Sequence, residues 1–275
     1  MKGKNWPILS SIAYAMLRSE RGLETTIGPF RAMLLRPKLL SIVSLVLQAR
    51  EIRNVRILKG KRFSLDDSSN SVAHNRNTSQ TVEKFPITTR RSEILYQLAN
   101  TAQPFISRRQ RQLLVVGPRN THELFIAWCH GFKWSNINAI DLFSINKKIQ
   151  VMDVESMTFK DSTFDTVCMS GVFAYLTNPR TALSEINRVL RPNGIVVIRY
   201  PTAAAPVDFA PSNTLNPSQV INWAKELGMT LAYYSYEVHT NSIKTRQITS
   251  LMCLKKGVRD GPSCYESVEF SLPEL

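Results

Sequence analysis

Two acidic residues in the second half of the sequence each end a short apolar run. Asp141 ends the run that begins at Asn138, and Asp153 ends the run that begins at Ile149. A carboxylate held at such a place can accept hydrogen bonds from two adjacent donors of a polar ligand. Either acid alone could equally cap a helix or shape a turn. Their joint order along the chain favours a binding site.

The elements that would position these acids alternate between strand-like and helix-like patterns. Expected strands span residues 113–116, 138–141, 149–153, 166–170 and 194–200, and expected helices span 92–103, 121–130, 179–190 and 217–227. This alternation predicts a doubly wound, mostly parallel seven-stranded sheet with helices on both faces. The last two expected strands, 230–239 and 247–255, have no helix between them. We therefore expect them to form an antiparallel hairpin at the sheet edge.

In such a sheet, ligands bind beyond the carboxyl ends of the strands near the point where the strand order reverses. The residues that fall there are Gly117 to Thr121, Asp141, Asp153 to Glu155, Ser170 with Gly171, and Tyr200 to Thr202.

The order of motifs at these strand ends resembles that of the class I S-adenosylmethionine-dependent methyltransferases of the small-molecule type. The likeness runs from about Arg111 to Lys256 and includes Leu-Leu-Val-Val-Gly at 113–117 and Ala-Ile-Asp-Leu at 139–142. Its most specific part extends from Asp153 to Gly194. There an acid, a Phe-Asp strand entry, a helix and an Arg-Val-Leu-Arg-Pro-Asn-Gly turn follow one another as they do in the family.

The resemblance implies a Rossmann-like methyltransferase fold and S-adenosyl-L-methionine as cofactor. Asp141, followed by Leu142, takes the place of the acid that accepts hydrogen bonds from both ribose hydroxyls in the family. Asp153 takes the place of the acid that binds the adenine amino group, and the backbone N–H of Val154 the place of the donor to the adenine ring. Ser170 stands where the family lines the pocket around the transferred methyl group.

The first loop departs from the family pattern. The family usually has an acid near the end of the first strand and glycines at alternate places after it, which let the backbone approach the cofactor. Here Val115 replaces that acid, Gly117 is retained, and Arg119 stands where a glycine is common. We expect Arg119 to pair with the cofactor carboxylate. The other expected first-loop contacts are Gly117, Pro118 and Asn120, with Thr121 and Glu123 as further polar groups.

The sequence assigns no general base. Methyl transfer from a sulfonium is an in-line displacement that depends largely on positioning, so a base is needed only for a protonated acceptor. Tyr175, His122 and His130 fall near the expected pocket, but isolated residues of these types are more often structural. The catalytic residue is therefore left unassigned, and no metal site is expected.

The acceptor class follows from a missing motif. No Asn-Pro-Pro-Tyr signature, as used on amide or base nitrogens, follows the fourth strand. A small-molecule, glycan or lipid acceptor is expected instead. Two alternatives stay open: a catalytically inactive methyltransferase-like binding module, suggested by the first loop, and a nicotinamide-dependent oxidoreductase. The oxidoreductase would need a G-x-G-x-x-G motif, and Gly117 stands alone.

The net charge of +14 is concentrated near the N-terminus. Residues 1–112 contain 20 Lys and Arg against seven Asp and Glu, whereas residues 113–275 contain 15 against 14. Apolar stripes at 8–17 and 39–47 alternate with these cations, a pattern that fits either peripheral contact with an anionic membrane through residues 1–62 or packing on the domain. Specific nucleic-acid binding is not expected, because residues 40–80 contain one aromatic residue, Phe63.

These patterns divide the chain into four parts. Residues 1–63 form a basic helical extension, 64–91 a linker rich in Ser, Asn and Asp, 92–256 the methyltransferase domain, and 257–275 a C-terminal tail. No apolar run reaches the roughly 20 residues of a membrane span. The widely spaced cysteines are expected to be buried thiols in a reducing compartment: Cys129, Cys168, Cys253 and Cys264. A cytoplasmic protein, peripheral at the membrane at most, is the expectation.

Overall fold

The structure is a computed structural model. It describes residues 24–25, 28–36, 39, 63–64, 90–118, 121–144, 147–202, 215–240 and 246–257. The sequence predictions for the apolar stripe 8–17, for nearly all of the linker and for the C-terminal tail beyond residue 257 lie outside the described residues.

Seven strands form one sheet in the order β5-β3-β2-β6-β7-β9-β8. Their bounds are β2 Leu113–Val116, β3 Ile137–Asp141, β5 Gln150–Val151, β6 Phe164–Ser170, β7 Leu190–Pro201, β8 Met229–Thr240 and β9 Arg246–Lys256. The strands from β5 to β7 pair in parallel, and β9 is antiparallel to both of its neighbours. Because the chain leaves β2 in one direction and returns to β6 on the other side, the strand order reverses between β2 and β6. The doubly wound sheet and the terminal hairpin are thus confirmed.

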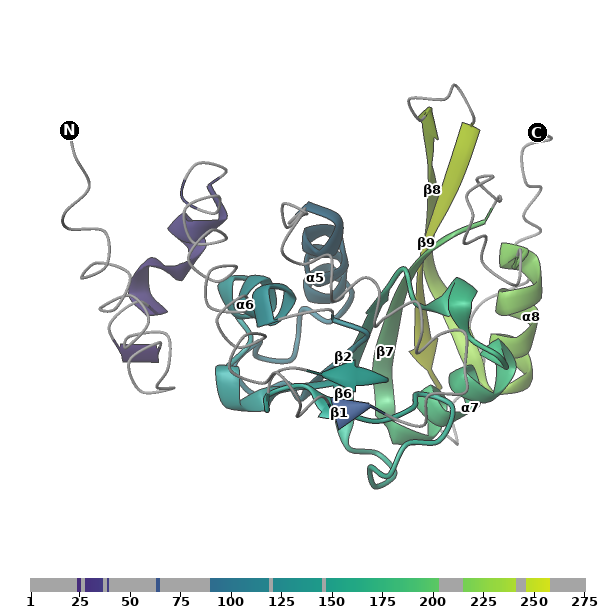
Figure 1. The fold of residues 1–275 in the computed structure, drawn as a ribbon, viewed down its shortest axis with the longest axis horizontal. Coiled ribbons are helices and arrows are strands. Elements are labelled where there is room, and N and C mark those ends of the chain that lie inside the picture. The colour runs from purple at the N-terminus through teal and green to yellow at the C-terminus, as the bar shows by residue number, and fades with distance from the viewer. Residues whose placement is uncertain are drawn as a thin grey trace.

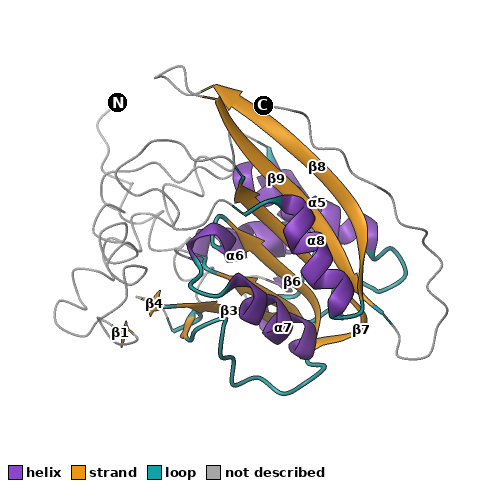
Figure 2. Ribbon diagram, turned by 90° about the vertical axis from the view of Figure 1, so that its right-hand side faces the viewer, coloured by secondary structure: helices purple, strands orange, loops and turns teal. Residues whose placement is uncertain are grey.

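Helices cover both faces of this sheet (Figures 1 and 2). The helices α5 (Arg90–Ala102) and α6 (Thr121–Cys129) lie on one face, and α7 (Pro179–Val189) and α8 (Pro217–Glu226) lie on the other. All four residues of β2 are buried, as expected for a parallel strand covered on both sides. Its side chains alternate between an α5/α6 core and an α7/α8 core.

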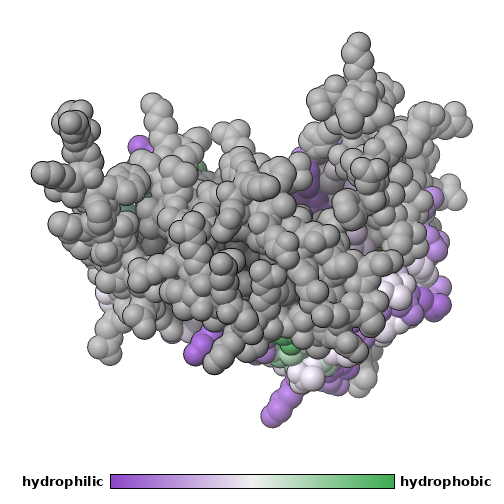
Figure 3. Space-filling view, viewed as in Figure 1, coloured by the Kyte–Doolittle hydropathy of each residue, from purple (hydrophilic) through white to green (hydrophobic). Residues whose placement is uncertain are grey.

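The helix α7 shows how local sequence sets an element. Asn178 caps its first turn by accepting a hydrogen bond from the backbone N–H of Thr181 at 3.2 Å, and Pro179 occupies the first helical position. One face of the helix is apolar and buried: Ala182, Leu183, Ile186 and Val189. The opposite side meets solvent, and the described surface near α7 and α8 is accordingly mostly hydrophilic or neutral in Figure 3.

Some boundaries differ from the sequence predictions. The strand β7 begins at Leu190, directly after α7, and so includes the segment that we interpreted as a turn before residue 194. Leu190 pairs with Phe164, and a register shift before Thr166 absorbs the irregular backbone there. The helix α5 begins at Arg90, two residues inside the predicted linker.

Part of the predicted basic extension packs on the domain. Glu24 accepts hydrogen bonds from the indole N–H of Trp128 at 2.9 Å and from the backbone N–H of Trp134 at 3.2 Å. The last two residues of the 3-10 helix Gly28–Leu35 (η2) pack against the α5/α6 core. The strand β1 (Phe63–Ser64) pairs antiparallel with β4 (Phe143–Ser144). Within the described parts of residues 1–64, packing on the domain is therefore the observed arrangement.

Two composition-based expectations can also be compared with the structure. Cys129, Cys168 and Cys253 are buried free thiols, as predicted, and Cys264 lies outside the described residues. Among the described residues, no helix is both long enough and apolar enough to cross a membrane.

Candidate functional site

Backbone hydrogen bonds bring the predicted strand ends to one edge of the sheet. The N–H of Gly117 donates to the carbonyl oxygen of Ile140 at 2.8 Å, so the residue after β2 still lies beside β3. The N–H of Met152 donates to the carbonyl of Asp141 at 3.0 Å and extends the β3–β5 pairing in the same way. The residues after β2, β3, β5 and β6 therefore share the carboxyl edge, on both sides of the reversal point.

Gly117 is required where it stands. Its φ of +70° lies in the left-handed region, which side-chain-bearing residues rarely adopt. A Cβ at this position would also lie 2.1 Å from Cγ2 of Val172, in the segment that follows β6. The glycine thus lets the loops after β2 and β6 meet at the reversal point. Pro118 is buried beside it, and the predicted contact Asn120, like Arg119, lies outside the described residues.

The missing acid of the first loop has a structural explanation. Val115 is 3% exposed and belongs to the α5/α6 core. A carboxylate at this position would be buried among apolar side chains, which offer no hydrogen-bond partner, and its burial would be costly. Two further predicted polar groups begin α6: Thr121 is buried, and Glu123 is half-buried, with its carbonyl accepting from the Tyr96 hydroxyl at 3.3 Å.

Asp141 and Leu142 are half-buried at the end of β3. Asp153 follows β5 and is also half-buried; one of its carboxylate oxygens accepts a hydrogen bond from the backbone N–H of Glu155 at 2.9 Å. Asp153 therefore shapes a turn, which is the structural alternative raised by its sequence. Its second carboxylate oxygen and the N–H of Val154 make no hydrogen bond to a described residue. Turn formation and ligand binding are compatible at this position.

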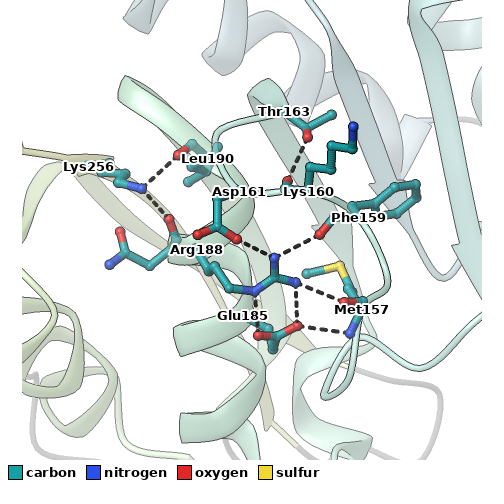
Figure 4. Close-up of polar contacts among 10 residues, drawn as sticks. Met157, Phe159, Lys160, Asp161, Thr163, Glu185, Arg188, Leu190 and Lys256 are labelled. Atoms are coloured by element: carbon teal, nitrogen blue, oxygen red, sulfur yellow. Dashed lines mark hydrogen bonds and ion pairs between the residues drawn. The ribbon is translucent and has the colours of Figure 1, made fainter.

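The segment that carries Asp153 is fastened to α7 at both ends. Near its start, a carboxylate oxygen of Glu155 accepts from the backbone N–H of Asn178 at 2.8 Å. Near its end, a carboxylate oxygen of Glu185 accepts from the N–H of Met157 at 2.9 Å (Figure 4).

Arg188 completes this attachment, and all five of its N–H donors are used (Figure 4). Its guanidinium donates to both carboxylate oxygens of Glu185 at 2.8 Å and to one oxygen of Asp161 at 2.7 Å. It also donates to the carbonyls of Met157 at 2.8 Å and Phe159 at 2.7 Å. Hydrogen bonding from Arg188 is the largest cause that lowers the pKa of the Glu185 carboxyl, and the pKa of Arg188 is raised in return. We refer to Arg188, Glu185 and Asp161 as the clasp.

The structure does not bring His122, His130 and Tyr175 together as a group of bases at the carboxyl edge. Burial lowers the pKa of His122 to about 4, and the side chain is completely buried in α6. Burial also lowers the pKa of His130 to about 4, and this residue follows the far end of α6. Tyr175 is half-buried in the short 3-10 helix Phe173–Tyr175 (η5), after the end of β6.

The end of β6 brings Ser170 next to a residue that the sequence analysis did not single out. Ser170 is half-buried, and its register partner on β7 is Arg199. The N–H of Gly171 donates to the carbonyl of Arg199 at 2.7 Å. The sequence could have indicated Arg199 as a site residue, because it directly precedes Tyr200 at the end of a predicted strand. No group of three or more His, Cys, Asp or Glu side chains in the described residues could hold a metal ion.

Comparison with known proteins finds one family match within the chain. Residues 134–198 match the family model described as a methyltransferase domain. No curated protein matches the chain. A S-adenosylmethionine-dependent methyltransferase from Methanosarcina mazei is similar at 13% identity and a TM-score of 0.44, over 58% of this chain and 98% of that one. The 1,6-didemethyltoxoflavin-N1-methyltransferase of Burkholderia thailandensis, solved with its namesake compound and S-adenosylhomocysteine, is similar at 10% identity and a TM-score of 0.49, over 72% and 97%.

The family match gives a methyltransferase domain at residues 134–198, and the sheet order around it is the doubly wound one expected from the sequence. The cofactor expected for such a domain is S-adenosyl-L-methionine. The carboxyl edge fits the adenosine part of that cofactor. It offers a half-buried carboxylate at Asp141 for vicinal hydroxyls, an open carboxylate oxygen at Asp153 for an amino group, and an adjacent backbone donor at Val154. The individual site residues remain predictions.

Proposed function

We propose that this methyltransferase acts on an oxygen or carbon nucleophile of a small-molecule, glycan or lipid acceptor. The observation that carries the proposal is the segment after β6. This segment has two aromatic residues. Phe173 is 0% exposed and packs against Tyr200 with ring centroids 5.5 Å apart, whereas Tyr175 is half-buried. The side chain of Phe173 is held in the core and does not offer its face to a planar base, which supports an acceptor other than nucleic acid.

The residues of the edge would act mainly by positioning. When bound, S-adenosylmethionine supplies an electrophilic methyl group on a sulfonium, which departs as S-adenosylhomocysteine after in-line attack. Asp141 would fix the ribose, and Asp153 with the N–H of Val154 would fix the adenine. Ser170, at the end of β6, would face the acceptor. The buried, neutral imidazole of His122 is not placed to take a proton from an acceptor hydroxyl.

Calorimetric titration with S-adenosylmethionine and S-adenosylhomocysteine tests the cofactor site. The change Asp141→Asn removes one strong acceptor, and losing a hydrogen bond to a charged group costs about 1.5–3 kcal/mol, or roughly 10- to 100-fold in affinity. Asp153→Asn should weaken binding in the same direction. Glu226→Gln is the control, because that side chain is 55% exposed and pairs with Arg180 on α7 rather than with the segment of Asp153. Equal affinities for all three variants and the unchanged protein would contradict these assignments.

Transfer of a labelled methyl group tests the acceptor class. The protein and methyl-labelled S-adenosylmethionine would be incubated separately with a lipid extract, a glycan pool, a small-metabolite pool and total RNA. We expect label in one of the first three pools. Label that enters RNA alone would overturn the proposed acceptor class.

We also propose that residues 1–62 contact anionic membrane from a cytoplasmic position. The excess of Lys and Arg in residues 1–112 supports the proposal. Co-sedimentation with vesicles of phosphatidylcholine alone, or mixed with phosphatidylglycerol, is the test. Binding should require the anionic lipid and fall as salt rises toward 0.5 M, where the screening length is only about 4 Å. Equal, salt-insensitive behaviour with both vesicles would exclude the contact.

A further inference from the structure

Arg199 occupies a distinctive place at the carboxyl edge. It pairs in register with Ser170 on β6 and with Leu251 on β9. Register partners point to the same face of a sheet, and Leu251 belongs to the α5/α6 core. The side chains of Arg199 and Ser170 therefore project on the α5/α6 face, next to the predicted position of the transferred methyl group.

The guanidinium of Arg199 is largely buried but makes little use of its donors. Its side chain is 12% exposed. Among the residues that the structure describes, it has one side-chain partner, a carboxylate oxygen of Glu237 at 3.2 Å. Arg188, which is more exposed at 30%, uses all five donors, and the buried Arg111 donates to three carbonyls and one side-chain oxygen.

The remaining donors of Arg199 are accessible. None of its nitrogens is among the buried, unpartnered side-chain atoms of the described residues. Glu237 offers limited competition, because its side chain is 44% exposed and contributes one contact on the β8 side of the guanidinium. A partly buried arginine with open donors suits a planar anionic oxygen group, which it can bind through two parallel hydrogen bonds.

We propose that Arg199 forms an anion subsite beside Ser170, so that the acceptor carries a carboxylate or phosphate group. This inference rests on the proposed function for its meaning, since the anion would be part of the acceptor. Binding of the anion itself does not require methyl transfer. Arg199 would hold the acceptor by its charge, and Ser170 would lie beside the nucleophile.

Calorimetry on the full-length protein saturated with S-adenosylhomocysteine provides the test. Inorganic phosphate and acetate are titrated in separate arms at constant ionic strength, with chloride as the reference anion. We expect at least one of them to bind, and Arg199→Met to weaken that binding at least fivefold. The matched control is Arg191→Met: Arg191 lies on the same strand, is 44% exposed and pairs with Asp165 near the amino end of β6. The control should leave anion binding unchanged.

A second variant keeps the test decisive if Arg199→Met disturbs the hairpin. Glu237→Gln leaves Arg199 in place and removes the competing carboxylate, so it should tighten anion binding several-fold. Absence of binding to the unchanged protein, or equal binding to the unchanged, Arg199→Met and Glu237→Gln proteins, would overturn the proposal. Separate titration of S-adenosylhomocysteine into each protein identifies failure of the cofactor site, which would refute the proposed function instead.

Discussion

Removing the guanidinium of the clasp should destabilise the protein and loosen the segment that carries Asp153. The change Arg188→Met keeps the aliphatic stem and removes five hydrogen bonds. The bond to Asp161 contributes less than about 1 kcal/mol, because that carboxylate is 75% exposed. The bonds to Glu185 and to two carbonyls are better shielded, but the guanidinium is 30% exposed and water can replace part of them. We expect a total loss of about 2–3 kcal/mol in the free energy of unfolding.

Urea unfolding at pH 7 measures this loss against a matched variant. Arg180→Met makes the same substitution on the same helix, where the pair with Glu226 is exposed at 63% and 55%. It should cost less than about 1 kcal/mol. The pKa of Glu185 is lowered from 4.5, so its pairing stabilises the fold above about pH 4.5, and this stabilisation is lost as the pH falls through the folded-state pKa. The difference between the unchanged protein and Arg188→Met should therefore shrink in acid.

Cofactor binding separates a positioning effect from a general loss of stability. Lys256 donates to the carbonyls of Asn187 and Leu190, at the end of α7. Lys256→Met should therefore lower stability without weakening S-adenosylhomocysteine, whereas Arg188→Met should weaken it several-fold. The reasoning is refuted if Arg188→Met costs no more stability than Arg180→Met. It is also refuted if Arg188→Met and Lys256→Met weaken S-adenosylhomocysteine binding equally.

Three further predictions concern buried groups. Burial lowers the pKa of His122 to about 4, so below pH 6.5 the unfolded chain takes up a proton that the folded protein does not. We expect the free energy of unfolding to fall by about 3 kcal/mol between pH 6.5 and pH 4. Urea titrations should show this slope and a shallower one in His122→Gln. The hydroxyl of Tyr200 is buried without a hydrogen-bond partner among the described residues, so Tyr200→Phe should leave the melting temperature unchanged or raise it; a clear fall would mean that the hydroxyl is satisfied. Burial raises the thiol pKa of three cysteines, which should therefore react with a thiol reagent only after denaturation, and rapid native labelling of any of them would contradict their burial: Cys129, Cys168 and Cys253.

The strands could be predicted from the sequence because parallel strands are covered on both faces and read as continuous apolar runs. The run at Leu113–Val116 was placed correctly for this reason. The start of β6 was missed by two residues, since Asp165 is a buried acid within the strand. Its carboxylate accepts a hydrogen bond from the backbone N–H of Gln112 at 2.8 Å and pairs with Arg191. These partners are distant in the sequence, so only the folded structure shows that the buried carboxylate is hydrogen-bonded. The turn predicted from the Pro and Gly at 191–194 is kept as an irregular segment within β7: these residues have no register partner on β6 or β9, and Asn193 has a left-handed φ of +62°.

The candidate site was only partly visible in the sequence. Asp141 and Asp153 could be placed at the edge because each ends a recognisable run. The clasp could not be predicted in full, because Arg188 and Glu185 are three residues apart while Asp161 lies 27 residues away from Arg188. The replacement contacts expected from Asn120 stay a prediction, since that residue is outside the described part of the chain.

The position of β9 has a consequence for synthesis on the ribosome. This strand is the last of the sheet to be made, yet it lies between β7 and β8. Until residues 246–256 leave the ribosome, β7 has no partner on that side, and its apolar residues 195–198 sit on an open strand edge. The pairing of β7 with β9, and of β9 with β8, therefore forms only after β9 has been synthesised. A nascent chain that stalls before β9 would expose a β-strand ready to pair with other chains, so chaperone protection matters most in that interval.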